Sequence, residues 1–336
     1  MAVIVPFESP SAASIDQLVG LVAADMERVN ATILSRTGSE VTMIPEVANH
    51  LISSGGKRLR PMLTLAMAGL TGYSGDGHIK LAASVEFMHT ATLLHDDVVD
   101  GSQLRRGKVA AHLIWGGASS VLVGDFLFAR AFELMVETGS LRALDILAKA
   151  SSVIAEGEVL QLTRAHDLNL NQDVYLEIVR AKTAELFAAA AEAGGVAAGA
   201  SDRHIAALRE YGLCLGLAFQ LTDDALDYGG ATETLGKNAG DDFREGKATL
   251  PLILAVARSG AREAPFWERA IGRLEQVEGD FRRARELVLG TGALESTLNL
   301  AFDYAEQAQR ALQLFPDNDW RRALEDLASF AVSRAA

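Results

Sequence analysis

Apolar residues recur at helical spacing along most of the chain. Residues 145–156 and 175–180 place apolar side chains three and four positions apart, as one buried face of an α-helix requires. Convincing runs of alternating apolar and polar residues are scarce, and Ala, Leu, Glu, Arg and Lys, which favour helix, are abundant. The pattern therefore predicts an all-α protein.

Proline and glycine mark where these helices are expected to end. None of the seven prolines lies between Pro61 and Pro251, and because proline is costly inside helices, this gap predicts long uninterrupted elements. Glycine-rich or polar stretches predict breaks at residues 53–56, 72–77, 167–173, 194–202, 229–246 and 259–265. None resembles an interdomain linker, so we expect a single domain over residues 1–336, with a short N-terminal extension at residues 1–15.

Composition excludes several classes of function. The 336 residues are 49% hydrophobic, which is enough for a sizeable core, and the net charge of −13 argues against a nucleic-acid-binding surface. The single cysteine, Cys214, excludes an intrachain disulfide and fits a reducing compartment. The sequence shows neither a signal peptide nor the roughly 20 apolar residues of a membrane span. We expect a cytoplasmic protein with at most peripheral membrane contact.

Two aspartate clusters of identical spacing are the strongest chemical signal. They contain Asp96, Asp97 and Asp100 in the first, and Asp223, Asp224 and Asp227 in the second. Each cluster follows an apolar, helical stretch, so its first and last carboxylates, four residues apart, share one helix face. Carboxylates crowded beside apolar surface are unfavourable unless cations neutralise them. Because Mg²⁺ commonly shares its ligand shell between carboxylates and substrate phosphates, the clusters predict a magnesium site.

Cationic residues lie near the clusters or at the edges of predicted loops. They are Lys57, Arg58 and Arg60 after a glycine pair, Arg105, Arg106 and Lys108 after the first cluster, Lys182 on a helix, and Lys237 and Lys247 after the second cluster. Glycine allows close approach of the backbone, and Arg offers bidentate hydrogen bonds to phosphate. Each group alone could simply be a solvated surface. Together with two clusters, they indicate a cavity that binds two diphosphates, at least one through Mg²⁺.

The ordered motifs resemble those of the trans-isoprenyl diphosphate synthases, the polyprenyl synthetase family. The matching segments are GGKRLRP at 55–61, LLHDDVVD at 93–100, LRRG at 104–107, VGD at 123–125, KT at 182–183, FQLTDD at 219–224 and FREGK at 243–247. They appear in family order and span roughly residues 20–330. The chain departs from the family at Ala110-Ala111-His112, at Gly116-Gly117 and at Asp241, and none of these changes removes an expected metal ligand.

The resemblance implies a large orthogonal helix bundle around a deep central cavity, in a homodimer. The six aspartates would hold Mg²⁺ on an allylic diphosphate. The residues expected to contact that diphosphate or its departing charge are Arg105, Lys182, Gln220 and Lys237, and those expected to bind isopentenyl diphosphate are Lys57, Arg60, His89 and Arg106. Thr183 and Lys247 are also expected to bind substrate. Of these, the resemblance gives catalytic roles to Asp96, Asp97, Arg105, Lys182, Gln220, Asp223 and Lys237.

The helix before Asp96 is expected to determine product length. Ala91 lies five residues before Asp96, where short-chain relatives tend to carry a bulky aromatic residue, and the first cluster lacks a two-residue insertion. A small Ala91, with Thr92 and Met88 beside it, would leave a tunnel open towards a floor near Phe132 and Met135. The segment resembles the octaprenyl and decaprenyl class that supplies quinone side chains, and the exact length stays open.

Other functions fit the sequence less well. The runner-up enzyme is a terpene cyclase or a head-to-head condensing synthase. A cyclase usually keeps one aspartate-rich cluster and an asymmetric second motif, and lacks the pair formed by Lys57 and Arg60, so two symmetric clusters argue against it. A non-catalytic synthase subunit would have lost aspartates, and a metal-buffering protein would not need the cations. A shorter-chain geranylgeranyl or farnesyl diphosphate synthase is the nearest alternative.

Overall fold

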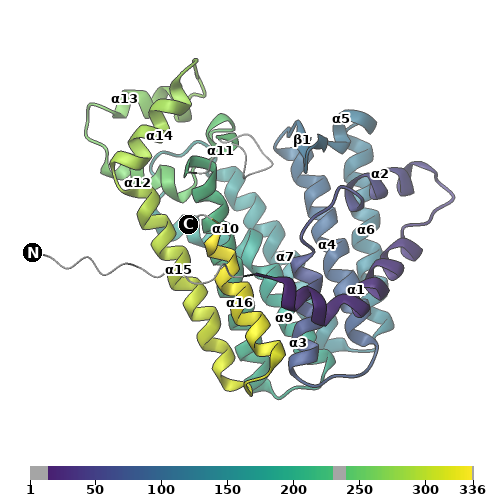
Figure 1. Cartoon of the computed structure of the whole chain (residues 1–336). Coiled ribbons are helices and arrows are strands. Elements are labelled where there is room, and N and C mark those ends of the chain that lie inside the picture. The colour runs from purple at the N-terminus through teal and green to yellow at the C-terminus, as the bar shows by residue number, and fades with distance from the viewer. Residues whose placement is uncertain (1–13, 230–239, 335–336) are drawn as a thin grey trace, which may run out of the picture.

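The computed structural model describes residues 14–229 and 240–334, and its α-helices pack side by side into a bundle (Figure 1). The elements are α1 (Asp16–Arg36), α2 (Met43–Ile52), α3 (Leu59–Leu70), α4 (Gly77–Val99), β1 (Leu104–Arg105), β2 (Lys108–Val109), α5 (Ala111–Trp115), α6 (Gly117–Glu137), α7 (Leu141–Thr163), α8 (Gln172–Val179), η1 (Arg180–Ala184), α9 (Glu185–Ala197), α10 (Asp202–Gly229), α11 (Asp241–Arg244), α12 (Leu250–Arg258), α13 (Ala264–Trp267), η2 (Glu268–Gly272), α14 (Asp280–Gly290), α15 (Ala293–Ala311), η3 (Leu312–Leu314) and α16 (Asp319–Ser333). Within the described ranges, strands occur only as the hairpin of β1 and β2. The predicted all-α bundle is confirmed.

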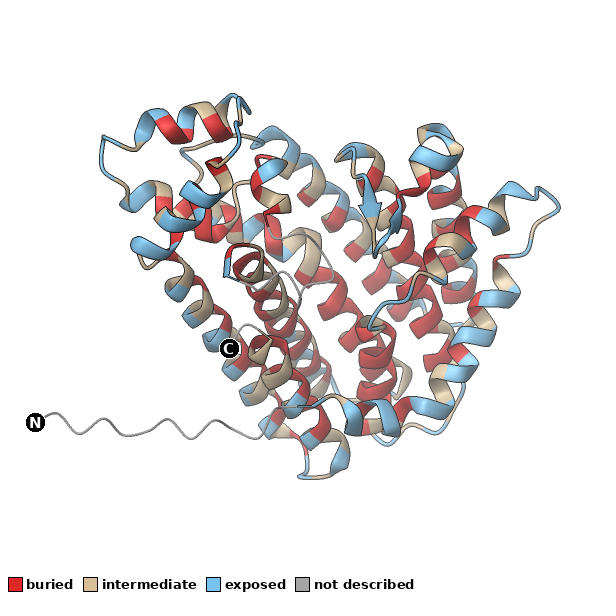
Figure 2. Cartoon of the chain, turned by 45° about the horizontal axis from the view of Figure 1, so that its top comes forward, coloured by how far each residue is buried: buried red, intermediate tan, exposed pale blue. Residues whose placement is uncertain are grey.

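The centre of the bundle consists of α3, α4, α9 and α10, in each of which at least half of the residues are buried (Figure 2). Helix α4 packs against α6, α3 and α9, and α10 packs against α9 and α15. Glycines bring α10 very close to α9, since a Cβ atom on Gly212 would lie 2.5 Å from the Phe187 carbonyl oxygen. The apolar runs that precede the two aspartate clusters are therefore the two central helices that carry those clusters.

The predicted breaks coincide with helix ends at most positions. Helices end before residues 53–56, 72–77 and 259–265, as expected. The break at 194–202 is partly wrong, because α9 continues through Gly194 to Ala197. Gly194 is needed there for packing, since a Cβ atom on it would lie 2.4 Å from the carbonyl oxygen of Thr64 in α3. This glycine permits close contact between helices and does not end one.

Two local irregularities present residues of the predicted site. Arg106 and Gly107 form the hairpin turn with φ values of 53° and 76°, and two successive positive φ values are the mark of a type I′ turn. The π-helical segment η1, between α8 and α9, carries Lys182 and Thr183. Gly157 of α7 accommodates η1, because a Cβ atom there would lie 2.7 Å from Cβ of Ala181. Such π turns are rare and are frequent at functional sites.

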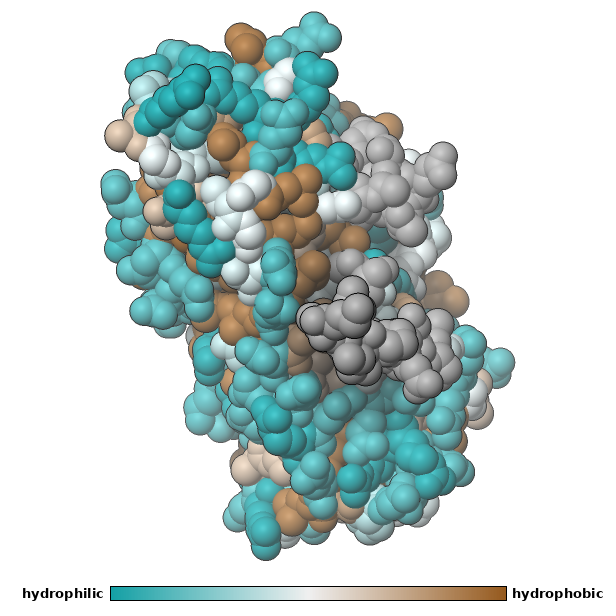
Figure 3. All heavy atoms as spheres, turned by 60° about the vertical axis from the view of Figure 1, so that its left-hand side comes forward, coloured by the Kyte–Doolittle hydropathy of each residue, from teal (hydrophilic) through white to brown (hydrophobic). Residues whose placement is uncertain are grey.

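The surface is mixed in character. On the face seen in Figure 3, hydrophobic side chains are interspersed with hydrophilic ones. Apolar side chains are exposed on α5 and α6, where Leu113, Ile114 and Leu122 are each about half or more accessible, at 48%, 49% and 67%. Across the described part of the chain, no helix has the length and apolar character needed to cross a membrane.

Candidate active site

The first aspartate cluster forms the C-terminal end of α4. Asp96 and Asp97 lie in its last turn, and Asp100 is the C-cap residue. Asp97 is fully buried and pairs through Oδ1 with Arg105 of β1, whereas its Oδ2 is buried and has no hydrogen-bond partner in the described residues. Burial raises the pKa of Asp96 above its ordinary value. Since the C-terminal end of a helix is itself partially negative, three carboxylates there form a site that favours cations.

Lys182 of η1 faces the first cluster from across the bundle. Its Nζ lies 2.7 Å from Oε2 of Glu158 in α7 and 3.8 Å from Oδ2 of Asp96. Burial raises the pKa of Glu158 to about 7, an effect that Lys182 opposes and Asp96 reinforces. The lysine therefore separates two carboxylates that would otherwise repel each other.

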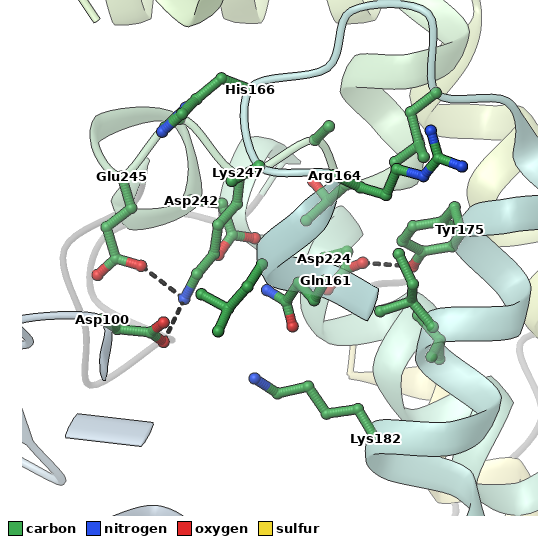
Figure 4. A pocket seen from close by; sticks show the side chains of 18 of the residues that line it. Asp100, Gln161, Arg164, His166, Tyr175, Lys182, Asp224, Asp242, Glu245 and Lys247 are labelled. Atoms are coloured by element: carbon green, nitrogen blue, oxygen red, sulfur yellow. Dashed lines mark hydrogen bonds and ion pairs between the residues drawn. The ribbon is translucent and has the colours of Figure 1, made fainter. Parts of the chain in front are cut away.

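Lys247 neutralises the same cluster from the loop after α11. Its Nζ lies 2.9 Å from Oδ2 of Asp100 and 2.7 Å from Oε2 of Glu245, as Figure 4 shows. Burial alone would lower the pKa of Lys247, but the two carboxylates outweigh that effect and raise it. The ammonium group thus joins two segments that are far apart in the sequence at the edge of a cavity.

The three carboxylates of the second cluster, on α10, make different contacts. Asp223 is half-buried and lies 2.8 Å, through Oδ1, from Nη1 of Arg334. Asp227 accepts the backbone N–H groups of residues 240–242 at 3.0–3.2 Å and so holds the start of α11. Asp224 is buried, which raises its pKa to about 7. The Asp223 side chain is 41% accessible, whereas Asp224 is buried.

Asp224 belongs to a chain of hydrogen bonds between three elements. Its Oδ2 accepts the hydroxyl of Tyr175 in α8, and its Oδ1 accepts Nε2 of Gln220 at 2.7 Å. The amide oxygen of Gln220 in turn accepts the hydroxyl of Thr183 at 3.0 Å. Both oxygens of this buried carboxylate are therefore engaged, and the chain fixes Gln220 and Thr183 relative to the second cluster.

A second cationic group lies between α3, α4 and the hairpin. Nη1 of Arg60 lies 3.2 Å from Nε2 of His89, and its guanidinium group lies over the ring of Phe187, 4.3 Å from the ring centre. Burial lowers the pKa of Arg60 to about 10. Burial, followed by the charge of Arg60 and of Arg106, holds the pKa of His89 well below its usual range, so that His89 is neutral at pH 7.

The glycine pair and the hairpin interlock beside this group. Arg106 donates a hydrogen bond to the carbonyl of Gly55, and a Cβ atom on Gly56 would lie 2.8 Å from Cζ of Arg106. Lys57 stands over the ring of Phe330 in α16, 5.1 Å from its centre. Two motifs that are 51 positions apart in the sequence, from Gly55 to Arg106, thus form one cationic surface.

A cavity of about 380 Å³ opens between the two clusters (Figure 4). The predicted site residues that line it are Asp100, Lys182, Thr183, Gln220, Asp224 and Lys247. The group around Arg60 and His89 does not line it, and Lys237 lies outside the described residues. Ala91 and Met88 are fully buried and Thr92 is half-buried, and since none of them lines this cavity, their role in a tunnel stays a prediction.

Several residues of the site were not predicted from the sequence, among them Glu158, Tyr175 and Arg334. Glu158 and Tyr175 lie on α7 and α8 and also line the cavity, and Arg334 contacts Asp223 from the end of α16. Glu158 and Tyr175 looked like ordinary positions of amphipathic helices. The spacing of Glu158 and Gln161, one helical turn apart and both at the cavity, was the available signal.

Comparison with known proteins agrees with the geometry. The sequence profile described as polyprenyl synthetase matches residues 41–288. The octaprenyl diphosphate synthase of Escherichia coli is 45% identical over 96% of this chain and 99% of its own. A polyprenyl synthase of Caulobacter crescentus, solved with calcium and isoprenyl diphosphate, is 72% identical with a TM-score of 0.94 over 98% of this chain and all of its own. A decaprenyl diphosphate synthase of Rhodobacter capsulatus is 53% identical with a TM-score of 0.93, over 96% of this chain and all of its own. This chain belongs to the polyprenyl synthetase family and is a prenyltransferase of the long-chain trans class.

Proposed function

We propose that this long-chain synthase adds isopentenyl diphosphate head-to-tail to an allylic diphosphate such as farnesyl diphosphate, and makes an octaprenyl-to-decaprenyl product for quinone side chains. The observation that carries the proposal is the presence of two separate groups of cationic side chains. One is the acidic cavity with Lys182 and Lys247, and the other is the surface formed by Arg60, Arg106 and Lys57. A head-to-tail condensation needs one site for each diphosphate.

The acidic side of the cavity suits Mg²⁺ that is shared with a substrate. Asp100 and Asp224 supply carboxylate oxygens to its lining. Oδ2 of Asp97, which belongs to the same cluster as Asp100 but does not line the cavity, is a buried oxygen without a partner in the described residues. Within those residues, no three acidic, histidine or cysteine side chains form a complete metal cage. Mg²⁺ rarely needs such a cage, because substrate phosphates and water complete its shell. When bound, Mg²⁺ would neutralise charge on the departing diphosphate, and the calcium complex of the Caulobacter crescentus relative supports a divalent cation here.

The cations of the cavity are held ready by carboxylates. Lys182 rests against Glu158, and Lys247 against Asp100 and Glu245. When Asp96 and Asp100 bind Mg²⁺, these lysines and Arg105 would pair with the allylic diphosphate instead and stabilise its departure. The resulting allylic cation would be attacked by the double bond of isopentenyl diphosphate and then lose a proton. The surrounding apolar helices would keep water away from the cation.

We further propose that the protein is a single-domain homodimer of the cytoplasm. The exposed apolar side chains of α5 and α6, among them Leu113, Ile114 and Leu122, support an interface between two copies.

The only cysteine, Cys214, is buried, and burial raises its pKa to about 12, so it is a packing residue rather than a reactive thiol.

The test is incubation of the purified protein with labelled isopentenyl diphosphate, farnesyl diphosphate and Mg²⁺, followed by mass spectrometry of the products. A ladder that ends at octaprenyl to decaprenyl is the expected result. A ladder that stops at geranylgeranyl or one unit beyond would indicate the shorter-chain synthase. No product, with or without Mg²⁺, would indicate the non-catalytic subunit. Omission of Mg²⁺ in the presence of a chelator is the control.

A further inference from the structure

Left-handed backbone at residues other than glycine occurs in pairs in this protein. The four such residues in the described ranges are Arg58, Arg106, His166 and Leu274, with φ between 49° and 63°. Arg58 and Arg106 both lie at the second cationic group, where the charge of each acts on the buried carboxylate of Glu86. Residues held in this unfavourable conformation cluster at functional sites, because the surrounding structure must stabilise them. The second pair, His166 and Leu274, is therefore also a candidate for a functional role.

His166 and Leu274 converge on one glycine. A Cβ atom on Gly246 would lie 2.4 Å from Cδ2 of Leu274 and 2.8 Å from Nδ1 of His166. His166 comes from the loop between α7 and α8, Leu274 from the segment after η2, and Gly246 from the segment after α11. Nδ1 of His166 is buried without a hydrogen-bond partner in the described residues, so the ring is held there by packing. Three loops thus meet at a contact that only glycine can occupy.

The contact lies directly before Lys247. Gly246 also has a positive φ of 68°, and its N–H group donates to the Phe243 carbonyl at 3.0 Å. The N–H group of Lys247 donates to the Asp242 carbonyl at 2.8 Å, which fixes the direction in which the lysine leaves the backbone. His166, Leu274 and Gly246 line the same cavity as Lys247, and Figure 4 shows His166 above Glu245 and Lys247.

We propose that His166 and Leu274 clamp Gly246 and thereby position the Lys247 ammonium for the diphosphate of the allylic substrate. They are positioning residues, because they act through the backbone of Lys247. The proposal rests on the proposed function for the identity of that diphosphate. A Lys side chain is a flexible point charge with four rotatable bonds, so its efficiency depends on where its backbone is fixed.

The variants His166→Asn and Leu274→Asn test the clamp. Asn tolerates left-handed backbone, so each change removes the side-chain contact and keeps the local conformation. Gly246→Ala disturbs the same contact by adding a Cβ atom to the glycine. Its matched control is Gly139→Ala, because Gly139 has nearly the same φ of 70°, and a Cβ atom on it would meet no atom of the described residues within 4 Å. Both alanine variants carry the same backbone cost, and only Gly246→Ala disturbs the clamp.

Two readouts are compared. Hydrogen exchange of the ligand-free protein should rise at residues 241–249 in His166→Asn, Leu274→Asn and Gly246→Ala, and stay unchanged in Gly139→Ala. The KM for the allylic diphosphate should rise about tenfold, as expected when one charged contact is lost, while the KM for isopentenyl diphosphate stays within about twofold.

Faster exchange with an unchanged KM for the allylic diphosphate would overturn the proposal, since the contact would then be merely structural. Equal effects of Gly246→Ala and Gly139→Ala would overturn it as well. If the unmodified protein transferred no prenyl group, the proposed function would fail separately. The clamp would then be tested by calorimetry, which measures the affinity for inorganic diphosphate in the presence of Mg²⁺. This affinity is expected to fall about tenfold in His166→Asn and Leu274→Asn.

Discussion

Arg105 and Asp97 form an ion pair at the base of the first aspartate cluster, with Nε and Nη2 of Arg105 at 2.7 and 2.5 Å from Oδ1 of Asp97. The Asp97 side chain is completely buried, whereas 20% of the Arg105 side chain remains accessible. Because Arg105 is followed by Arg106 in the hairpin, the pair joins the C-terminal end of α4 to the second cationic group. Substitution of Asp97 would therefore remove two features, the unpartnered Oδ2 and the ion pair with Arg105 of the hairpin.

We expect Asp97→Ala to lower turnover by orders of magnitude, because a predicted Mg²⁺ ligand is removed. Arg105 would also lose its partner, which should lower the free energy of unfolding by on the order of 2 kcal/mol, less than for a fully buried pair. Turnover at saturating Mg²⁺ and the Tm are the measurements. Asp96→Asn, whose ion pair with Lys182 is long at 3.8 Å, should lose turnover at an almost unchanged Tm. Near-normal rates in Asp97→Ala would show that the metal assignment is wrong.

Substitution of Ala91 tests the predicted tunnel. Ala91 is fully buried in α4, and a phenylalanine there should block chain growth and shorten the product without abolishing turnover. Overpacking should cost roughly 1–3 kcal/mol of stability. Ala82→Phe, on the opposite side of the same helix, is the control and should lower the Tm without changing the product ladder. An unchanged ladder in Ala91→Phe, read by mass spectrometry, would remove Ala91 from the tunnel wall.

Tyr175→Phe tests the hydrogen-bond chain at Asp224. Burial already raises the pKa of Asp224 to about 7, and the Tyr175 hydroxyl acts to lower it, so the pKa should rise further in the variant. The acidic limb of kcat/KM should therefore move to higher pH, with kcat reduced roughly tenfold as Gln220 loosens. Tyr211→Phe is the matched control, since its buried hydroxyl bonds the Leu324 carbonyl instead. The idea fails if both variants keep the pH profile of the unmodified protein.

The stability of the ligand-free protein should depend on pH through Glu158. Burial raises the pKa of Glu158 from 4.5 to about 7, so that between these values the folded protein binds a proton that the unfolded chain has lost. The free energy of unfolding then falls as pH rises through this window. Thermal unfolding in the presence of a chelator should show that Glu158→Gln gains Tm relative to the unmodified protein at about pH 8 and not at about pH 5. If the Tm of Glu158→Gln and that of the unmodified protein changed in parallel with pH, the raised pKa of Glu158 would be contradicted.

Features set by local sequence were predictable. The helices follow from apolar spacing, and the aspartate clusters lie on the two central helices because long apolar runs precede them. The turn at Arg106 was recognised as a motif, but its left-handed conformation depends on Gly107 and on the pairing of β1 with β2.

Features set by tertiary contact were not predictable. Arg334 reaches Asp223 across 111 positions, and Lys247 reaches Asp100 across 147. The three carboxylates of the second cluster look equivalent in the sequence. In the structure, Asp224 accepts hydrogen bonds from Tyr175 and Gln220, whereas Asp227 accepts them from backbone N–H groups. Their separate environments arise only once α8, α10 and α11 have packed together.

The π-helical turn makes the site sensitive to the number of residues in one helix. Deleting any one residue between Arg180 and Ala184 would rotate everything on one side of the deletion by about 100° relative to the other side. Tyr175, before the turn, contacts Asp224, and Phe187, after it, lies under Arg60. Both contacts could not survive that rotation. The phase of this helix, rather than any single side chain, keeps the two proposed diphosphate sites in register with each other.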